Sequence, residues 1–131
     1  MIVAKRYTLT EAYAFFGIKL RNFRTSWSGR NPDDGTVAVT LWQDEFRDYG
    51  KIFRPGDIED PDARLGSIEL MENLRWAIDH CDSMVRVVVA AAKDLTAKQR
   101  KQRLCFPHPT MRMRIVELRE RERGVIFERV D

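Results

Sequence analysis

The chain has 131 residues, of which 44% are hydrophobic and 33% are charged, a balance typical of a globular protein rather than a disordered one. We expect one domain spanning residues 1–131, because a second core of useful size would need a longer chain. The longest apolar run, 85–92, is interrupted by Arg86 and is far shorter than the ~20 residues that span a bilayer, so no membrane partner is predicted. No signal-like apolar segment follows the first positive charges, and Cys81 and Cys105 make no disulfide framework, so we expect a cytoplasmic protein.

The formal net charge of +3 is unevenly distributed along the chain. Residues 44–72 hold nine acidic and four basic side chains, whereas residues 86–123 hold eleven basic and four acidic ones. A basic half can attract polyanions even when the whole chain is nearly neutral. The alternative is a solvated surface, or pairing of the two regions within the fold.

The first predicted element is a short helix. Thr8 and Glu11 have the T-x-x-E spacing of a capping box, apolar residues follow at helical spacing, and Gly17 can end the helix in the left-handed conformation. Residues 17–23 are then expected to form a connection.

Strand patterns follow this helix. Segment 37–42 alternates with period 2, and the short arm 25–30 is expected to pair with it across the polar turn 31–35 as a hairpin. Residues 51–54 predict a short third strand. The acidic, proline-containing segment 56–64 predicts an exposed loop.

The second half predicts one helix and three strands. Ser67 is the expected N-cap of a helix that runs to about His80, with an apolar stripe that leaves Trp76 nearly opposite. The basic segment 93–103 is expected to be a short helix or an ordered loop. Strands are predicted at 85–92, 111–115 and 125–130.

This order of elements does not alternate strands with helices, which argues against a doubly wound parallel sheet. We predict an α+β domain with a curved mixed sheet, or a partly closed β-barrel, of about five to six strands with two helices. The sequence shows no internal repeat and no low-complexity segment.

Two tryptophans flank the predicted hairpin. Trp42 alternates with Val37 and Val39 along its strand, so it points away from the core if those two residues point toward it. One interpretation is that the other sheet face is also covered, by the second helix for instance, and that the rings pack there. The other is that Trp27 and Trp42 stack on nucleobases, where each stacked base contributes on the order of 1–3 kcal/mol.

Cations gather in segment 93–103 and on the strand predicted after it. Phosphate binding needs cations on one surface, and each neutralised phosphate adds salt-dependent affinity. The residues predicted to contact nucleic acid in this region are Lys93, Lys98, Arg100, Lys101, Arg103, Arg112 and Arg114.

Metal and catalytic sites are weakly indicated. His80, Cys81, Cys105 and His108 are competent zinc ligands, but adjacent side chains diverge by about 100° on a helix, so no metal or other cofactor is predicted. A restriction-type nuclease would need an acid two residues before Lys93, where the chain has alanine. No other catalytic motif is present, so no catalytic residue is predicted, and an enzyme is the third alternative.

Several short motifs resemble a small family of bacterial proteins with a "WSW-x-A…DG-x-V-x-L-x-x-WQDE" signature, some of which occur beside or fused to HNH-type nuclease modules. The matching residues are Trp27-Ser28, Asp34-Gly35-Thr36-Val37, Leu41-Trp42-Gln43-Asp44-Glu45 and the later Ala91-Ala92-Lys93-Asp94, with Gly29 in place of the second signature tryptophan. The layout is also similar to PUA-related domains of the EVE and SRA types. That resemblance implies a base-binding pocket lined by aromatic rings and flanked by cations, without catalytic residues.

The sequence therefore predicts a non-catalytic nucleic-acid-binding domain that recognises a modified or flipped base, with DNA favoured over RNA. Trp27 and Trp42 would stack, Arg30 would contact a base edge or a phosphate, and segment 93–103 would hold the backbone. The alternative is a protein-interaction module, such as an inhibitor or accessory subunit of a defence nuclease.

Overall fold

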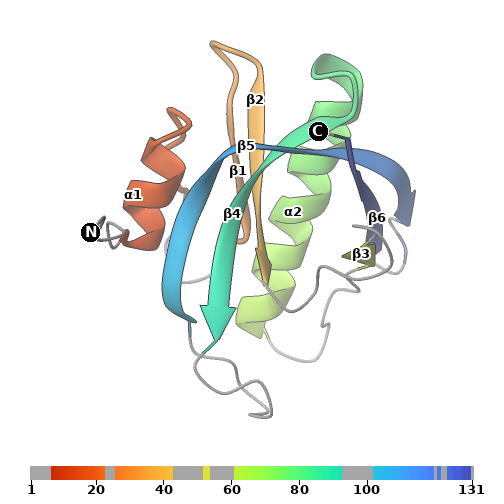
Figure 1. The fold of residues 1–131 in the computed structure, drawn as a ribbon. Helices are drawn as coiled ribbons and strands as arrows, with labels where there is room; N and C mark the ends of the chain where they lie inside the picture. The colour runs from red at the N-terminus through yellow and green to blue at the C-terminus, as the bar shows by residue number, and fades with distance from the viewer. Residues whose placement is uncertain are drawn as a thin grey trace.

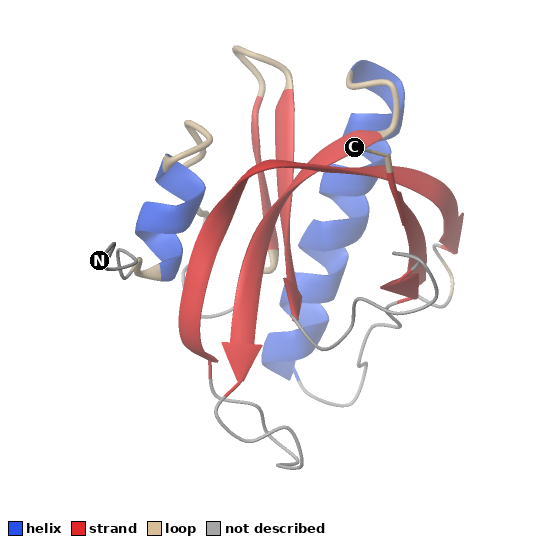
Figure 2. Cartoon of the chain, in the orientation of Figure 1, coloured by secondary structure: helices blue, strands red, loops and turns tan. Residues whose placement is uncertain are grey.

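The structure, a computed structural model, describes residues 7–22, 26–42, 52–53, 61–92, 102–119, 121 and 124–130. Two helices, α1 (Leu9–Ala14) and α2 (Pro61–His80), accompany one mixed sheet (Figures 1 and 2). The strands are β1 (Ser28–Asn31), β2 (Thr36–Trp42), β3 (Ile52–Phe53), β4 (Met84–Ala92), β5 (Gln102–Arg119) and β6 (Gly124–Arg129). The described part of the chain contains no helix with the length and apolar character needed to cross a membrane.

The sheet has the strand order β1-β2-β4-β5-β6-β3. Strands β2 and β4 are parallel, and every other neighbouring pair is antiparallel. The α+β class with a curved mixed sheet is thus confirmed, and β5 bends across the whole sheet in Figure 1. Of the two forms predicted, the open one is found, because β1 and β3 are the outer strands and are not paired with each other in the described ranges.

Local sequence signals determine α1 and the hairpin. The backbone N–H of Thr8 donates to the Glu11 carboxylate at 3.0 Å, and the Glu11 N–H donates to the Thr8 hydroxyl at 3.1 Å, which completes the predicted capping box. In the hairpin, the Gly35 N–H donates to the Asn31 carbonyl at 3.0 Å, and Gly35 has the positive φ of 71° that such a turn favours. The predicted pairing of the two arms is confirmed, with Ser28 opposite Val39.

Helix α2 begins seven residues earlier than predicted. Its first residue is Pro61, and proline is well suited to this position because its missing N–H has no partner within a helix in any case. The predicted N-cap, Ser67, instead lies buried inside the helix. The predicted loop 56–64 is therefore wrong for residues 61–64, and residues 56–60 lie outside the described ranges.

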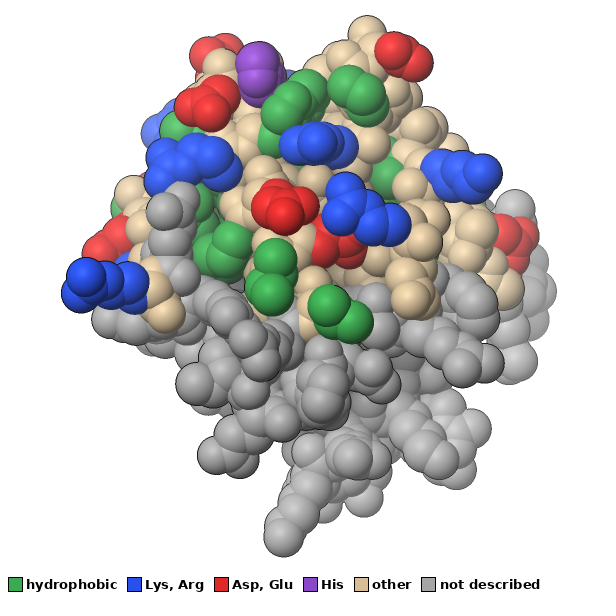
Figure 3. Space-filling view, turned by 180° about the vertical axis from the view of Figure 1, so that it is seen from behind, with side chains coloured by type: hydrophobic (Ala, Val, Ile, Leu, Met, Phe, Trp, Pro, Cys, Tyr) green, Lys and Arg blue, Asp and Glu red, His purple; other side chains and the backbone are tan. Residues whose placement is uncertain are grey.

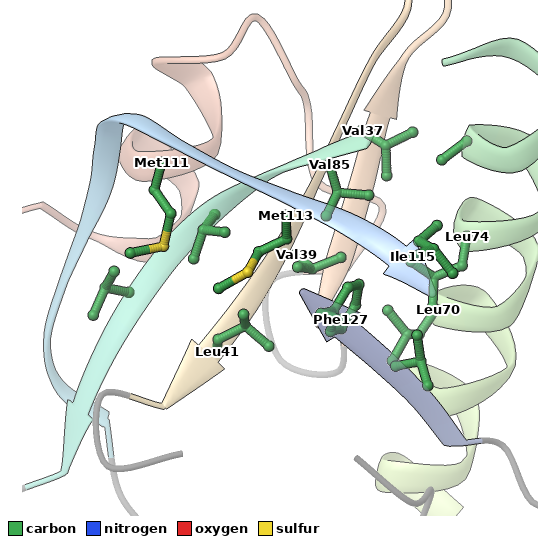
Figure 4. Packing of buried hydrophobic residues seen from close by; sticks show 14 residues of the cluster. Val37, Val39, Leu41, Leu70, Leu74, Val85, Met111, Met113, Ile115 and Phe127 are labelled. Atoms are coloured by element: carbon green, nitrogen blue, oxygen red, sulfur yellow. The ribbon is translucent and has the colours of Figure 1, made fainter. Parts of the chain in front are cut away.

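A hydrophobic core lies on each face of the sheet. On one face α2 contributes Leu70 and Leu74 to a core with β2, β4, β5 and β6, and these side chains converge in Figure 4. The strand residues that meet them include Val37, Val39, Leu41, Val85, Met111, Met113, Ile115 and Phe127.

On the other face, α1 and the segment after it build a second core. Its buried members are Ala12, Tyr13, Phe16, Ile18, Leu20, Ala38, Val88 and Cys105. The hydroxyls of Tyr13 and Thr40 are hydrogen-bonded at 2.6 Å inside this layer. One interpretation of the tryptophans was that the second helix covers this face of the sheet. The face does carry a core, but α1 packs on it rather than α2.

Gly29 is explained by this second layer. A Cβ atom at this position would lie 2.5 Å from Cγ2 of Ile18, which is closer than such atoms approach. Ile18 is itself buried, at 2% exposure, so it has little room to move. A side chain as large as tryptophan could not occupy position 29 in this packing.

Candidate nucleic-acid interface

Only part of the predicted interface lies within the described residues. Lys93, Lys98, Arg100 and Lys101 fall outside them. Trp42 and Arg103 are described as backbone in β2 and β5 without their side chains. Of the predicted interface residues, the structure describes the side chains of Trp27, Arg30, Arg112 and Arg114.

The Trp27 ring is half-buried, and Arg30 lies on the α2 face of the sheet. The Trp27 carbonyl accepts a hydrogen bond from the Thr40 N–H at 2.9 Å, which continues the hairpin ladder beyond β1. The Arg30 guanidinium lies 5.4 Å from the ring centre of Trp76, a cation–π distance. Arg30 is exposed, so its outer edge can still contact a ligand.

Trp76 occupies a different environment from the one predicted. Instead of facing away from the core, it is half-buried and packs against the α2-side core. Its ring centre is 4.7 Å from that of His80, so Trp76 contacts both Arg30 and His80. Nearby, the Asn73 side chain donates to the buried Ser28 hydroxyl at 2.8 Å, which holds β1 against α2. Helix α2 therefore packs on the hairpin as well as on the central strands.

Arg112 and Arg114 lie on the opposite face of the sheet. Their neighbours Met111, Met113 and Ile115 enter the α2-side core, so the arginines between them project toward the α1 side. Both arginines are exposed, and no ion pair to another described residue is found for either. This part of the predicted cation set is accessible from solvent.

Arg86 joins these two residues, although the sequence drew attention to it only as an interruption of an apolar run. It is directly opposite Arg112 in the β4–β5 register, and its guanidinium lies 5.0 Å from the Phe16 ring centre. Burial lowers the pKa of Arg86, and the neighbouring charge of Arg112 lowers it further. A single charged residue among valines is the signal that could have identified this position.

A bulge in β5 explains how Arg86 is held. The register runs from Arg86 opposite Arg112 to Val88 opposite Pro107, so residues 108–111 have only one β4 residue across from them. Arg86 Nη2 donates to the Pro109 carbonyl within the bulge. The His108 Nδ1 atom accepts hydrogen bonds from the backbone N–H groups of Thr110, at 3.3 Å, and Met111, at 2.9 Å. Side chains thus satisfy backbone groups that the bulge removes from the ladder.

Two cavities open on the described surface. One, of about 250 Å³, lies where β2 and β4 begin, and its lining residues are Gly35, Thr36, Val37, Cys81, Asp82, Met84, Val85, Arg86 and Arg112. The other, of about 300 Å³, lies beside the first half of α2 and is lined by Arg21, Asn22, Ser26, Leu65, Ile68, Glu69 and Glu72.

The four possible zinc ligands have other partners. The thiols of Cys81 and Cys105 donate to the carbonyls of Gly35, at 3.1 Å, and Tyr7, at 3.3 Å, while His80 packs on Trp76. Within the described ranges, no group of three or more His, Cys, Asp or Glu side chains is arranged to hold a metal ion.

Charged side chains are found on both sides of the molecule. In Figure 3, the side opposite to that of Figure 1 shows Lys and Arg interspersed with Asp, Glu and apolar side chains. On the α1 side, Arg86, Arg112 and Arg114 lie together on neighbouring strands. Comparison of the chain with protein-family models, curated proteins and solved structures finds no match.

Proposed function

We propose that this protein is a non-catalytic, cytoplasmic nucleic-acid-binding domain that favours DNA. The observation that carries the proposal is the group of three arginines, Arg86, Arg112 and Arg114, on one face of β4 and β5. Arginine presents a planar fork of donors that matches phosphate oxygens, and this geometry makes it common at nucleic-acid surfaces.

In the proposal, Trp42 and the predicted loop cations complete the surface near the end of β4, away from the three arginines. The chain leaves β4 at Ala92 and enters β5 at Gln102, and these two residues are paired. The backbone of Trp42 is paired with Ala90, two residues before that point. In the proposal, Trp42 and Trp27 stack on a flipped or modified base, as the PUA-like layout would imply, while the cations of segment 93–103 hold phosphates.

Binding is tested by fluorescence anisotropy with labelled duplex DNA, single-stranded DNA and RNA at about 50 and 200 mM salt. The Arg112→Gln/Arg114→Gln variant should weaken binding and reduce the salt slope by about 0.9 for each duplex phosphate that the variant no longer neutralises. Arg121→Gln, at an exposed residue in the turn between β5 and β6, is the matched control for charge. No binding at low salt would contradict the proposal, and so would binding that survives both this variant and alanine at Lys98, Arg100, Lys101 and Arg103.

A second candidate function is protein interaction, for example as an inhibitor or accessory subunit of a defence nuclease. It is favoured by the cavity beside α2, where Leu65 is 58% and Ile68 is 38% exposed. Arg21 pairs there with Glu69 at 3.4 Å and with Glu72 at 3.7 Å, so polar groups border an apolar patch. A pull-down from nuclease-treated lysate separates the two functions, because a protein partner persists and a nucleic-acid bridge does not.

A further inference from the structure

The cavity of about 250 Å³ at the start of β2 and β4 has two arginines in its wall. Arg86 and Arg112 are directly opposite each other on neighbouring antiparallel strands. Like charges in such a cross-strand pair repel and destabilise the sheet. Asp82 also lines the cavity, so one carboxylate accompanies two guanidinium groups, and neither arginine forms an ion pair with a described residue.

Arg86 is held in position before any ligand arrives. The bulge carbonyl of Pro109 accepts from its Nη2 atom, and the Phe16 ring lies 5.0 Å from its guanidinium carbon. Its Nε atom is buried and has no hydrogen-bond partner. A buried donor without a partner is costly, and a bound anion or a functional role is one explanation for such a group in a folded protein.

Arg112 completes the pair from the solvent side. It is exposed and extends from β5 beside the cavity mouth. The other walls of the cavity come from the start of β2 at Gly35 and from the turn between α2 and β4. In that turn Asp82 and Ser83 have φ values of 53° and 63°, and the Met84 N–H donates to the Cys81 carbonyl at 3.0 Å. Such a conformation is sparsely populated for residues other than glycine and persists only where the surroundings hold it.

We propose that this cavity binds a phosphate monoester between the guanidinium groups of Arg86 and Arg112. A monoester carries a charge of about −1.5 to −2 at pH 7, so it neutralises two cations, whereas a phosphodiester carries a single charge. The cavity volume lies just below the ~300 Å³ where pockets for whole drug-sized ligands begin, which suits a phosphate with a small part of its carrier.

Two sources share this chemistry: a terminal phosphate of a polynucleotide and a free mononucleotide. The first source rests on the proposed nucleic-acid-binding function, and the second does not. Calorimetry measures the binding of inorganic phosphate and AMP. Anisotropy measures the binding of three versions of one oligonucleotide sequence, with a 5′-hydroxyl, a 5′-phosphate or a 3′-phosphate end.

Inorganic phosphate should bind. In addition, either AMP should bind, or one of the phosphorylated oligonucleotides should bind more tightly than the version with a 5′-hydroxyl end. Arg112→Gln should weaken phosphate binding by about tenfold or more, because the substitution removes a charge-assisted bidentate pair of hydrogen bonds. Arg112→Lys keeps the charge but lacks the planar fork of donors, so its affinity for phosphate should lie between those of the unmodified protein and Arg112→Gln. Arg121→Gln should bind phosphate as the unmodified protein does.

Arg114→Gln provides a sharper comparison, because Arg114 lies two residues from Arg112 on the same face but does not line the cavity. It should weaken the hydroxyl and phosphate oligonucleotides by the same factor, whereas Arg112→Gln should remove the preference between them. Far-ultraviolet circular dichroism and the melting temperature of each variant confirm that the fold is retained.

The possible failures are distinguishable. If oligonucleotides bind without any preference for a terminal phosphate, and neither inorganic phosphate nor AMP binds, the cavity proposal is overturned while the proposed function stands. If phosphate or AMP binds in an Arg112-dependent manner and no oligonucleotide binds at low salt, the proposed function fails while the cavity proposal stands. Phosphate binding that is unchanged in Arg112→Gln also overturns the cavity proposal.

Discussion

Replacing Ser67 with alanine should stabilise the protein, although the sequence pattern predicts the opposite. If Ser67 were an N-cap, its substitution by alanine would lower the free energy of unfolding by about 0.5–2 kcal/mol. In the structure it lies inside α2, is only 6% exposed, and its hydroxyl oxygen is buried without a hydrogen-bond partner. The two assignments therefore predict free-energy changes of opposite sign at one residue.

The magnitude of the gain follows from three contributions. Alanine is a better helix former than serine by about 0.5 kcal/mol. Removing an unsatisfied buried hydroxyl recovers a desolvation cost of about 1 kcal/mol, at the lower end of its usual range. The removal of the oxygen's van der Waals packing offsets roughly half a kcal/mol. The expected net gain in the free energy of unfolding is about 1 kcal/mol, or about 3–5 °C in melting temperature for a chain of this size.

Urea denaturation followed by circular dichroism measures this change, with the slope m used to check that the unfolding reaction is the same. Thr8→Ala is the matched control, because Thr8 caps α1 with both capping-box hydrogen bonds and should lose about 1 kcal/mol. A loss of stability in Ser67→Ala of the size seen in Thr8→Ala would refute the burial argument and restore the cap.

Three other substitutions follow from the same structure. Gly29→Ala should lower the free energy of unfolding by about 1–3 kcal/mol, because the new Cβ atom meets Ile18. In a double-mutant cycle with Ile18→Ala, the two free-energy changes should be non-additive, and additive changes would contradict the clash. Without phosphate, Arg112→Gln should raise the free energy of unfolding by a few tenths of a kcal/mol, as removal of a like-charge neighbour of Arg86 requires, and a decrease in urea titrations would contradict it. Burial, followed by nearby carboxylates, raises the pKa of the Cys81 thiol above the ordinary 9.0. The stability that the neutral thiol contributes is therefore present below pH 9 and is lost as pH rises through the folded-state pKa. Cys81→Ala should flatten this decline in the free energy of unfolding at high pH, and an unchanged pH profile would contradict the assignment.

Features determined by neighbouring residues were predicted well from the sequence. The capping box at Thr8 and the turn before Gly35 need only residues within a few positions, and both form as predicted. The start of α2 was missed because proline and acidic residues are compatible both with an exposed loop and with the first turn of a helix. Nothing local distinguishes the two, and the packing of later residues such as Leu70 and Leu74 decides for the helix.

The arrangement of the site depends on contacts between residues far apart in sequence. Alternation placed Val37 and Val39 on one face correctly, but it could not show that α1 would cover the other. The bulge that positions Arg86 depends on the register between β4 and β5, and no spacing within either strand reveals it. Sequence reasoning therefore identified the arginines of β5 without identifying which cations of the neighbouring strand face them.

The register also shows how far the arginine pair lies from the end of β4. Arg86 is opposite Arg112, and Ala92, after which the chain continues into the basic segment 93–101, is six residues farther along β4, about 20 Å away. In the proposal, a nucleic acid that contacts both the arginines and cations beyond Ala92 extends over about six base-pair rises of a duplex. Duplexes shorter than this should therefore lose affinity in the Arg112→Gln/Arg114→Gln variant or in the loop variant, but not in both, whereas longer ones should be weakened by each. Equal sensitivity of the shortest duplexes to both variants, measured by anisotropy, would show that the two groups act as one site and would contradict two separate contact regions.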